Sequence, residues 1–457
     1  MVWKLKKAIR LPFLDFTSSA ERERTSRREL ELNVAHAPGM YRDVVAVVRK
    51  PDGGLALGGD GEVVDWVLRM APVHAADFLD AIAAAGVLTP DLLDATADAV
   101  TDMHRRLPPV RRDQVAGLRA IAEGNHESAA SAGMDRPAID AWRAAMRREL
   151  AAQAGWLARR EEAGFVRRIH GDLHLGNLCL WQGRPVPFDA LEFDEDMATF
   201  DLGYDLAFLL MDLDIRAGRA AANRVMNRYF ARTGDVALLA GLPLFLSMRA
   251  MVRAHVETRS GHVVAGAAYL ERALAYLHPP PPAVFAIGGL PGTGKSTVAR
   301  ALAPDIGPAP GAVILRSDEV RKFLNNVAPE QRLPESAYSA SASKAVFDRL
   351  ASLTALAVAA GHAVIADATF MAPPDRAAIR AAAGKAPFHG IWLTAALGEL
   401  ESRVAARVGD ASDADVSVLR RAAQADPGAG DWRAVSAGAT DDPVAAIRLI
   451  MSHNNPI

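Results

Sequence analysis

The chain has 457 residues, of which half are hydrophobic and 23% are charged, with 52 basic and 54 acidic side chains. This length allows two or three domains, each with its own core. The near-neutral charge argues against a dedicated nucleic-acid-binding protein, because such proteins cluster Lys and Arg against phosphates. The single cysteine, Cys179, excludes an internal disulfide or a cysteine-based metal site and favours a reducing cytoplasm.

The sequence shows neither a signal peptide nor a membrane span. The basic start, residues 1–7, is not followed by an uninterrupted apolar core. One of the most apolar stretches, residues 206–211, is bounded by aspartates and is far too short to cross a bilayer. We therefore expect a cytoplasmic protein that does not bind membranes.

The first 70 residues are rich in predicted strands. Residues 44–48 and 63–68 are β-branched runs, and Pro51–Gly54 between them is a strong turn signal. From residue 75 to about 276 the pattern becomes mostly helical, with a break around residues 166–193. A small strand-rich lobe followed by a larger helical lobe is the outline of a protein-kinase-like α+β fold.

A candidate catalytic loop lies in the break, at residues 170–177, which read His-Gly-Asp-Leu-His-Leu-Gly-Asn. Asp172 is followed five residues later by Asn177, and Asp189 comes twelve residues after that, a spacing suited to a β-hairpin. In kinase-type phosphotransferases an aspartate orients and deprotonates the acceptor hydroxyl, while an asparagine and a second aspartate hold Mg²⁺. The sequence therefore predicts Asp172 as the base and Asn177 and Asp189 as metal ligands.

A kinase also needs a lysine on an early strand, paired with a glutamate on a helix, to hold the α- and β-phosphates. Lys4 and Glu29 are the predicted pair, with Lys6 and Glu31 as alternatives. The strands and glycine-rich loop that precede such a lysine in kinases are absent before Lys4, so we expect a truncated small lobe. A degenerate, weakly ATP-binding kinase is the other interpretation of this half.

Most of residues 1–277 resembles the aminoglycoside and choline phosphotransferase group, whose loop reads H-G-D-x-H-x-x-N. The match extends to Asp201–Phe208, where that family keeps a structural aspartate. The resemblance implies that Asp172 is the base and that His170 and Asp205 brace the loop. We interpret His170 and His174 as core or supporting histidines, because the neighbouring Asp and Asn already suit Mg²⁺ and not zinc.

The clearest domain boundary is the proline run at residues 278–283, which neither helix nor sheet can cross. We divide the chain there into residues 1–277 and 284–457. Downstream, short apolar runs alternate with helical stretches, which predicts an α/β domain with a parallel sheet. The predicted strands are residues 284–287, 313–315, 364–366 and 391–393.

A complete phosphate-binding loop, G-x-x-x-x-G-K-S, follows the first of these strands and opens a helix. Its glycines let backbone N–H groups converge on phosphate oxygens, and the helix N-terminus adds positive charge. Lys295 is predicted to reach the β- and γ-phosphates and Ser296 to bind Mg²⁺. The predicted nucleotide-binding residues are Gly289, Leu290, Pro291, Gly292, Thr293, Gly294, Lys295, Ser296 and Thr297.

Polar residues after the next strands complete this predicted site. Asp318 and Arg321 follow residues 313–315, where Asp318 suits a general base and Arg321 an acceptor-binding residue, although the same segment also suits a helix start. Asp367 ends the strand at 364–366, the expected place for a carboxylate on Mg²⁺. Arg403 and Arg407, four apart on one predicted helical face, suit a lid that neutralises the transferring group.

Residues 284–425 resemble the small P-loop kinases that group with gluconate kinase, polynucleotide 5′-kinases and zeta-type toxins. That resemblance implies that Asp318 is the general base. Over nearly its whole length the chain is similar to fusions known as bifunctional phosphotransferase/ATP-binding proteins, with an AAA-type second half. The implied activity is transfer of a phosphoryl group from ATP, with Mg²⁺, to a hydroxyl of a sugar, an aminoglycoside-like compound or another small molecule.

Two other functions remain open from the sequence. One is an ATPase switch in which the first half is a degenerate kinase-like sensor, and the other is 5′-phosphorylation of nucleic acid. The near-neutral charge and the absence of a basic stripe argue against nucleic acid as a partner. The oligomeric state and both acceptors are not determined by the sequence.

Overall fold

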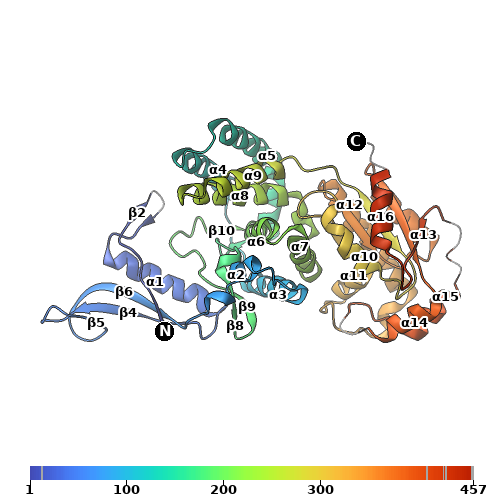
Figure 1. Ribbon diagram of the computed structural model, residues 1–457, viewed down its shortest axis with the longest axis horizontal. Coiled ribbons are helices and arrows are strands. Elements are labelled where there is room, and N and C mark those ends of the chain that lie inside the picture. Colours follow the sequence, from blue (N-terminus) through green and yellow to red (C-terminus); the bar gives the residue numbers. More distant parts are fainter. Residues whose placement is uncertain (12–13, 408–409, 426, 428–429, 454–457) are drawn as a thin grey trace. The chain divides into compact units, whose positions relative to one another are not determined.

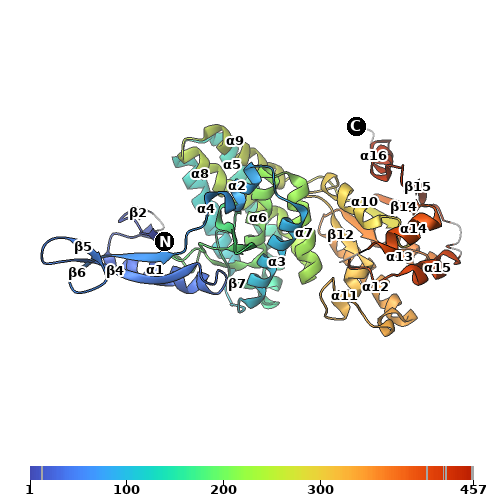
Figure 2. The ribbon, with the colours of Figure 1, turned by 60° about the horizontal axis from the view of Figure 1, so that its bottom comes forward.

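The computed structural model describes residues 1–11, 14–407, 410–425, 427 and 430–453. The chain folds into two compact units, each of which uses two stretches of the sequence. The first unit contains Met1–Gly218 and Leu244–Leu277, and the second contains Arg219–Pro243 and His278–Ile457. Figures 1 and 2 show the helices and strands of both units.

A four-stranded sheet of order β1-β6-β4-β5 begins the first unit, and its registered pairs are antiparallel. Helix α1 packs against β4 and β6 of this sheet (Figure 1). Its N-terminus is capped by the Ser18 side chain, which accepts a hydrogen bond from the N–H of Glu21. The elements of this lobe are β1 (Val2–Lys4), β2 (Arg10–Leu11), β3 (Leu14–Asp15), α1 (Ser19–Val34), β4 (Tyr41–Arg49), β5 (Leu55–Leu57) and β6 (Glu62–Met70).

The rest of the first unit is mainly helical, as the sequence pattern predicts. Helix α6 is buried from Leu202 to Asp214, and its N-terminal Asp201 forms a buried two-bond ion pair with Arg160 of α5. The helices are η1 (Ala75–Asp77), α2 (Leu79–Ala84), α3 (Pro90–Arg106), α4 (Gln114–Ser131), α5 (Arg136–Glu162), η2 (Leu175–Asn177), α6 (Leu202–Arg216), α8 (Leu242–Arg259) and α9 (Val263–Tyr276). The strands are β7 (Val166–Arg168), β8 (Leu178–Trp181), β9 (Arg184–Pro187) and β10 (Thr199–Asp201).

The lone cysteine, Cys179, is fully buried in β8 and packs with Met40, Tyr41 and Leu68. Burial raises the pKa of its thiol to about 11, so the thiol stays protonated near neutral pH. Cys179 is therefore a core residue of the first unit, in keeping with its apolar neighbours in the sequence.

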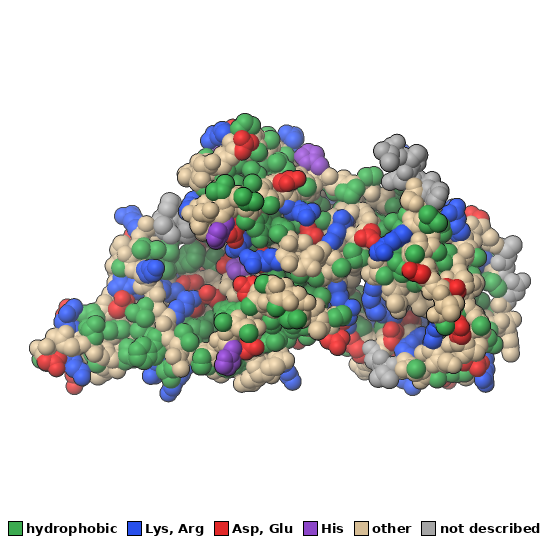
Figure 3. All heavy atoms as spheres, viewed as in Figure 1, with side chains coloured by type: hydrophobic (Ala, Val, Ile, Leu, Met, Phe, Trp, Pro, Cys, Tyr) green, Lys and Arg blue, Asp and Glu red, His purple; other side chains and the backbone are tan. Residues whose placement is uncertain are grey.

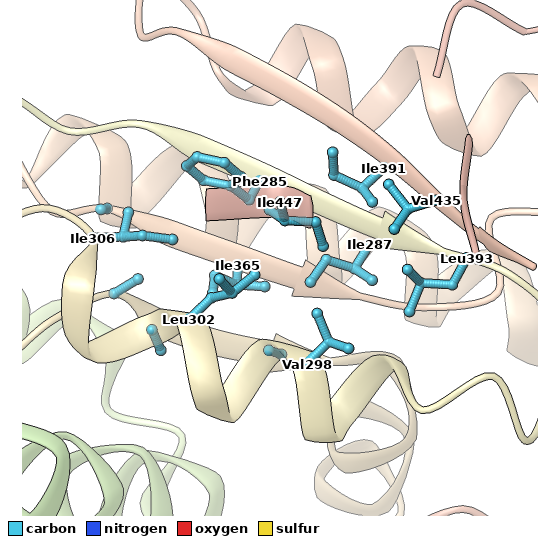
Figure 4. Close-up of a cluster of buried hydrophobic side chains, with 14 of the residues drawn as sticks. Phe285, Ile287, Val298, Leu302, Ile306, Ile365, Ile391, Leu393, Val435 and Ile447 are labelled. Atoms are coloured by element: carbon cyan, nitrogen blue, oxygen red, sulfur yellow. The ribbon is translucent and has the colours of Figure 1, made fainter. Parts of the chain in front are cut away.

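The second unit is built on a parallel sheet of five strands in the order β12-β13-β11-β14-β15. The apolar core lies between the strands and helices α10 and α16, with Phe285, Ile287 and Ile365 on the strands and Leu302 on α10 (Figure 4). The strands are β11 (Val284–Gly288), β12 (Val313–Arg316), β13 (Val364–Asp367), β14 (Phe388–Thr394) and β15 (Arg433–Ser436). The helices are α7 (Arg219–Thr233), η3 (Val236–Ala240), α10 (Lys295–Leu302), η4 (Ala303–Asp305), α11 (Ser317–Leu324), η5 (Glu335–Tyr338), α12 (Ala340–Ala359), α13 (Pro373–Ala382), α14 (Leu397–Ala405), α15 (Val416–Ala423) and α16 (Pro443–His453).

Residues 219–243 belong to the second unit, whereas the division predicted at the proline run assigns them to the first. The reason is that α7 covers the edge strand β12. Asn227 accepts a hydrogen bond from the N–H of Ile314 (2.7 Å) through Oδ1, and both Asn223 and Asn227 donate to the carbonyl of Ala312 (3.1 and 3.2 Å). These side chains satisfy backbone groups that an open sheet edge leaves without partners.

The predicted fold class is confirmed: a kinase-like α+β unit precedes an α/β unit with a P-loop and a parallel sheet. All four strands predicted for the second unit are present, and β15 is an additional strand that the sequence analysis did not predict. In the part of the chain that the structure describes, no helix is both long and apolar enough to span a bilayer.

Candidate phosphate-binding and catalytic sites

The glycine-rich loop of the second unit joins β11 to α10, and close packing explains two of its glycines. Gly289 has a φ of +135°, and a Cβ there would lie 2.5 Å from the carbonyl oxygen of Leu393. Gly292 has a φ of +86°, and its Cβ would lie 2.9 Å from the carbonyl oxygen of Leu400. Side chains at these positions would displace the loop from β14 and α14, so glycine is required at both. Within the loop, Thr293 Oγ1 donates to the carbonyl of Leu290 (2.9 Å).

Lys295 is the first residue of α10, and its ammonium group folds back over the loop. It donates to the carbonyl oxygens of Gly289 (3.0 Å) and Leu290 (2.9 Å). Burial lowers the pKa of Lys295, and the negative charges of Asp367 and Asp318 oppose that effect. A partly desolvated cation held only by carbonyl oxygens in these contacts is ready to exchange them for phosphate oxygens.

The hydroxyl of Ser296 donates to Asp367 Oδ2 at 2.5 Å, although 71 residues separate the two. The parallel register of β11 and β13 produces this contact, because it pairs Ile287 with Asp367 and places both strand ends at one edge of the sheet. A hydroxyl and a carboxylate within hydrogen-bond distance supply oxygen ligands of the kind that Mg²⁺ prefers. The two predicted metal ligands of this unit therefore fit Mg²⁺.

Asp318 lies in the first turn of α11, directly after β12. Burial raises its pKa, and the guanidinium of Arg316 is the main opposing influence. A carboxyl group whose pKa lies above its ordinary value is a stronger base than an exposed aspartate. The prediction that the segment also starts a helix is confirmed, since α11 runs from Ser317 to Leu324.

Arg316 connects three carboxylates around this site, and the sequence analysis did not single it out. Its guanidinium contacts Glu319 (3.1 Å), Asp410 (2.9 Å) and Asp367 (3.5 Å). The Arg316 side chain is only 6% exposed and that of Asp367 only 5%. The partners come from helix α11, which follows Arg316 directly, from strand β13 and from a distant loop, so no local sequence pattern identifies the whole cluster.

The remaining predicted arginines occupy different positions. Arg321 is buried, donates to the carbonyl of Ala337 (2.6 Å) and stacks on the ring of Tyr338 (4.7 Å). Arg403 donates to the carbonyl of Ala437 (2.8 Å). The prediction that Arg403 and Arg407 share a helical face is wrong, because α14 ends at Ala405 and Arg407 lies beyond it.

Most of these side chains line one cavity of about 1050 Å³. A volume at the upper end of the range for small-molecule sites can hold a nucleotide together with an acceptor. The predicted residues on its wall are Pro291, Gly292, Gly294, Lys295, Ser296, Thr297, Asp318, Arg321, Asp367, Arg403 and Arg407. The cavity also has walls that were not predicted, which include Arg316, Arg332, Tyr338, Phe347, Asp413 and Arg421.

In the first unit, the loop at 170–177 connects β7 to β8 and brings Asp172 and Asn177 together. Asn177 Nδ2 donates to both the carboxylate and the carbonyl of Asp172 (2.9 Å each). His174 Nε2 lies 3.5 Å from the same carboxylate, whose side chain is 44% exposed. Burial opposes ionisation of Asp172, but His174, His170 and Arg249 outweigh it and hold the pKa at about 2.

Asp205, from α6, lies beneath this loop. Its two carboxylate oxygens accept hydrogen bonds from the backbone N–H groups of His170 (2.8 Å) and Gly171 (2.9 Å), and His104 Nε2 lies 3.4 Å away. The ring of His170 contacts the carbonyl of Phe188 through Nε2 (2.9 Å). These contacts tie the loop to α6 and to the segment that carries Asp189.

The predicted lysine–glutamate pair is present in the first unit. Lys4 contacts Glu29 (2.8 Å) and Asp189 (2.5 Å), so residues 185 positions apart meet. Burial lowers the pKa of Lys4, but Asp189 and Glu29 together raise it above its ordinary value. Asp189 itself has a φ of +61°, a strained conformation typical of functional positions.

The same network shows which contacts the alternative residues, Lys6 and Glu31, make. Lys6 is buried and contacts Glu29 (2.9 Å) as well as Glu192, a carboxylate that the sequence analysis did not select. Glu31 instead pairs with Arg28 (2.8 Å) on the exposed side of α1. Glu29 therefore pairs with both lysines. Glu192 could have been found from the sequence, because it lies only three residues after Asp189.

Comparison with known proteins gives a family match in the second half of the sequence and relatives over most of its length. Residues 284–425 match a family described as an AAA domain. Among curated proteins, an uncharacterised protein of Mycobacterium tuberculosis, Rv2004c, is 29% identical over 452 residues, covering 93% of this chain and 87% of that protein. An uncharacterised protein of Mycobacterium bovis, Mb2027c, aligns equally well.

Solved structures with similarity to parts of the chain include kinases of two kinds. A gluconokinase from Sinorhizobium meliloti is 18% identical, with 38% of this chain and 98% of that chain covered and a TM-score of 0.25. The aminoglycoside phosphotransferase APH(4)-Ia is 14% identical, with 57% of this chain and 83% of that chain covered and a TM-score of 0.37.

Proposed function

We propose that the chain is an ATP-dependent phosphotransferase with two phosphoryl-transfer units, each acting on a hydroxyl group of a small molecule. The observation that carries the proposal is the single cavity in which Lys295, the Ser296–Asp367 pair and Asp318 meet. A phosphate cradle, oxygen ligands for Mg²⁺ and a carboxylate base are the components that phosphoryl transfer needs.

In the second unit, Mg·ATP supplies the γ-phosphoryl group when it is bound. The loop amides and Lys295 would hold the phosphates, and Ser296 and Asp367 would hold the metal. Asp318 accepts the proton of the acceptor hydroxyl, and the raised pKa of this partly buried carboxyl favours that role. Arg407, which faces the same cavity and whose charge acts on Lys295, is placed to neutralise the transferring group.

In the first unit, Asp172 is the proposed base, and Asn177 and Asp189 are the proposed metal ligands. Lys4 would exchange its contact with Asp189 for phosphate oxygens, while Glu29 would keep it oriented. The contacts of Lys4 with Glu29 and Asp189 favour an active first unit over a degenerate sensor.

Charge on the surface favours a small acceptor over nucleic acid. On the face shown in Figure 3, Lys and Arg side chains are interspersed with Asp and Glu. Nucleic-acid-binding proteins instead gather basic side chains into stripes that follow the phosphates.

The test is a metabolite-pool screen with γ-labelled ATP, using the full chain, its Lys295→Ala and Asp172→Ala variants, and the double variant. We expect label on a small hydroxyl compound, reduced by each single variant and lost in the double variant. Release of labelled phosphate that no pool stimulates would instead indicate an ATPase switch. Label on RNA 5′ ends, with binding that weakens steeply as salt rises, would indicate a polynucleotide kinase.

A further inference from the structure

The small lobe of the first unit contains two lysines, Lys4 and Lys6, that contact the same glutamate. Lys4 contacts Glu29 Oε1 (2.8 Å) and Lys6 contacts Glu29 Oε2 (2.9 Å), so each oxygen of this carboxylate holds one ammonium group. Beyond Glu29, Lys4 contacts Asp189 (2.5 Å) and Lys6 contacts Glu192. Five charges therefore alternate in sign along a series of contacts that starts and ends on the same short segment.

The two lysines differ in their access to solvent. The side chain of Lys4 is 36% exposed, whereas that of Lys6 is only 6% exposed. The ammonium group of Lys6 also lies over the ring of Phe16, 5.3 Å from its centroid. Both carboxylates that Lys6 contacts are buried, and breaking a buried ion pair is strongly unfavourable. Lys4 can therefore exchange a partner for a ligand, while Lys6 keeps its partners.

The segment that carries Asp189 is held to the small lobe through its backbone as well. The N–H of Asp189 donates to the hydroxyl of Tyr41 on β4 (2.9 Å), and the N–H of Ala190 donates to Asn33 Oδ1 (3.0 Å). Asn33, which is buried on α1, also donates to the carbonyl of Glu29 (2.8 Å). The position of the proposed metal ligand therefore depends on contacts with the small lobe.

We propose that Lys6 and Glu192 form a positioning pair of the first unit, which keeps Asp189 in place for Mg²⁺ when Lys4 leaves it for a phosphate group. The inference rests on the proposed function of the first unit. Without a ligand, Lys4 neutralises Asp189, and the exchange of Lys4 to phosphate oxygens makes this carboxylate available to a metal ion. The contact between Lys6 and Glu192 takes no part in that exchange, so it holds Glu29 and the metal-binding segment fixed.

The test measures equilibrium binding of a non-hydrolysable ATP analogue to the full chain, as a function of Mg²⁺ concentration and in EDTA. Every sample carries Lys295→Ala, which suppresses the second unit. The variants are Lys6→Met, Glu192→Gln, the two together, and Lys4→Met. The matched control is Lys7→Met, which removes an exposed cation one residue from Lys6. Thermal unfolding reports whether each variant is folded.

We expect Lys6→Met and Glu192→Gln each to raise the Mg²⁺ concentration for half-maximal binding by about 10-fold or more, the typical effect of removing a residue that orients a metal ligand. Binding in EDTA should stay at the level of the background chain, because Lys4 and Glu29 remain. The double variant should be no weaker than the weaker single variant, since all three lack the same contact. Lys4→Met should weaken binding in EDTA as well, by about 10-fold, because it removes a charged hydrogen bond to phosphate. Lys7→Met should have no effect.

Mg²⁺ dependence that is the same in Lys6→Met, Glu192→Gln and the background chain overturns the inference. Binding of Lys6→Met in EDTA that is as weak as that of Lys4→Met overturns it as well, because Lys6 would then hold phosphate itself. If Lys6→Met does not fold, Glu192→Gln, which keeps the shape of the side chain, decides by its Mg²⁺ dependence. The absence of any Mg²⁺-dependent binding in the background chain would reject the proposed function of the first unit together with the inference, whereas unchanged Mg²⁺ dependence rejects the inference alone.

Discussion

Replacing Arg316 by Met tests whether the arginine organises the acidic side of the second site. Arg316→Met removes the cation shared by Glu319, Asp367 and Asp410 and leaves three carboxylates close together. Breaking a buried ion pair costs about 3–5 kcal/mol. The side chains of Glu319 and Asp410 are 19% and 26% exposed, so solvent reduces the loss, and we expect about 3 kcal/mol.

The loss should depend on pH in a defined direction. Burial opposes ionisation of Asp410, but Arg316 is the main influence that keeps its pKa below the ordinary 3.8. A lowered pKa contributes stability that is present above the ordinary value and is lost as the pH falls through the folded value. Without Arg316 this contribution disappears, so the difference between variant and parent should be greatest near neutral pH and shrink in acid.

The assay is urea unfolding followed by tryptophan fluorescence, with calorimetry to separate the two units. A loss of about 3 kcal/mol corresponds to a thermal-unfolding midpoint that is lower by roughly 6–12 °C for a unit of this size. Mg²⁺-dependent binding of an ATP analogue should weaken as well, because Asp367 loses its neighbour. Arg316→Lys is the matched control and should recover part of both effects. An unfolding free energy and Mg²⁺ dependence equal to the parent's would refute the assigned role of Arg316.

Two further predictions concern pH and the domain boundary. Burial raises the pKa of Asp318, whereas His174, His170 and Arg249 hold the pKa of Asp172 at about 2, so the two activities should differ in acid. Between about pH 4 and 8, transfer by an Asp172→Ala chain should rise with pH and transfer by a Lys295→Ala chain should not. Identical acid limbs would contradict this assignment. Asn227→Ala should destabilise the second unit by about 1–3 kcal/mol, because the N–H of Ile314 loses its acceptor. Asn227→Asp, which keeps an acceptor oxygen, is the control. Equal unfolding midpoints for the parent and both variants would count against α7 as part of that unit.

Local patterns were sufficient to predict much of this molecule. The strands of the second unit are apolar runs, and the P-loop is a contiguous motif in which close packing requires Gly289 and Gly292. The pairing of Lys4 with Glu29 was predicted because a kinase needs a lysine–glutamate pair, whereas the contact of Lys4 with Asp189 was not predicted. In such cases a short segment, or a known combination of segments, contains the whole signal.

The features that escaped prediction depend on partners distant in sequence. Helix α7 has an ordinary amphipathic pattern, which does not reveal that its asparagines cover β12. Strand β15 has one buried residue, Val435, and is defined by its pairing with β14. Arg316 gains its importance from groups on other elements, so it has no local signature.

The most direct test of the account is equilibrium binding of a non-hydrolysable Mg·ATP analogue to the Asp172→Ala chain, with and without Lys295→Ala. Because Lys295 is held only through loop carbonyls in its hydrogen bonds, its ammonium group is available to phosphates. The account predicts that the second substitution weakens binding by about 10- to 100-fold, the equivalent of 1.5–3 kcal/mol for a charged hydrogen bond. Equal affinities with and without Lys295 would contradict the claim that the loop at 289–296 holds the triphosphate.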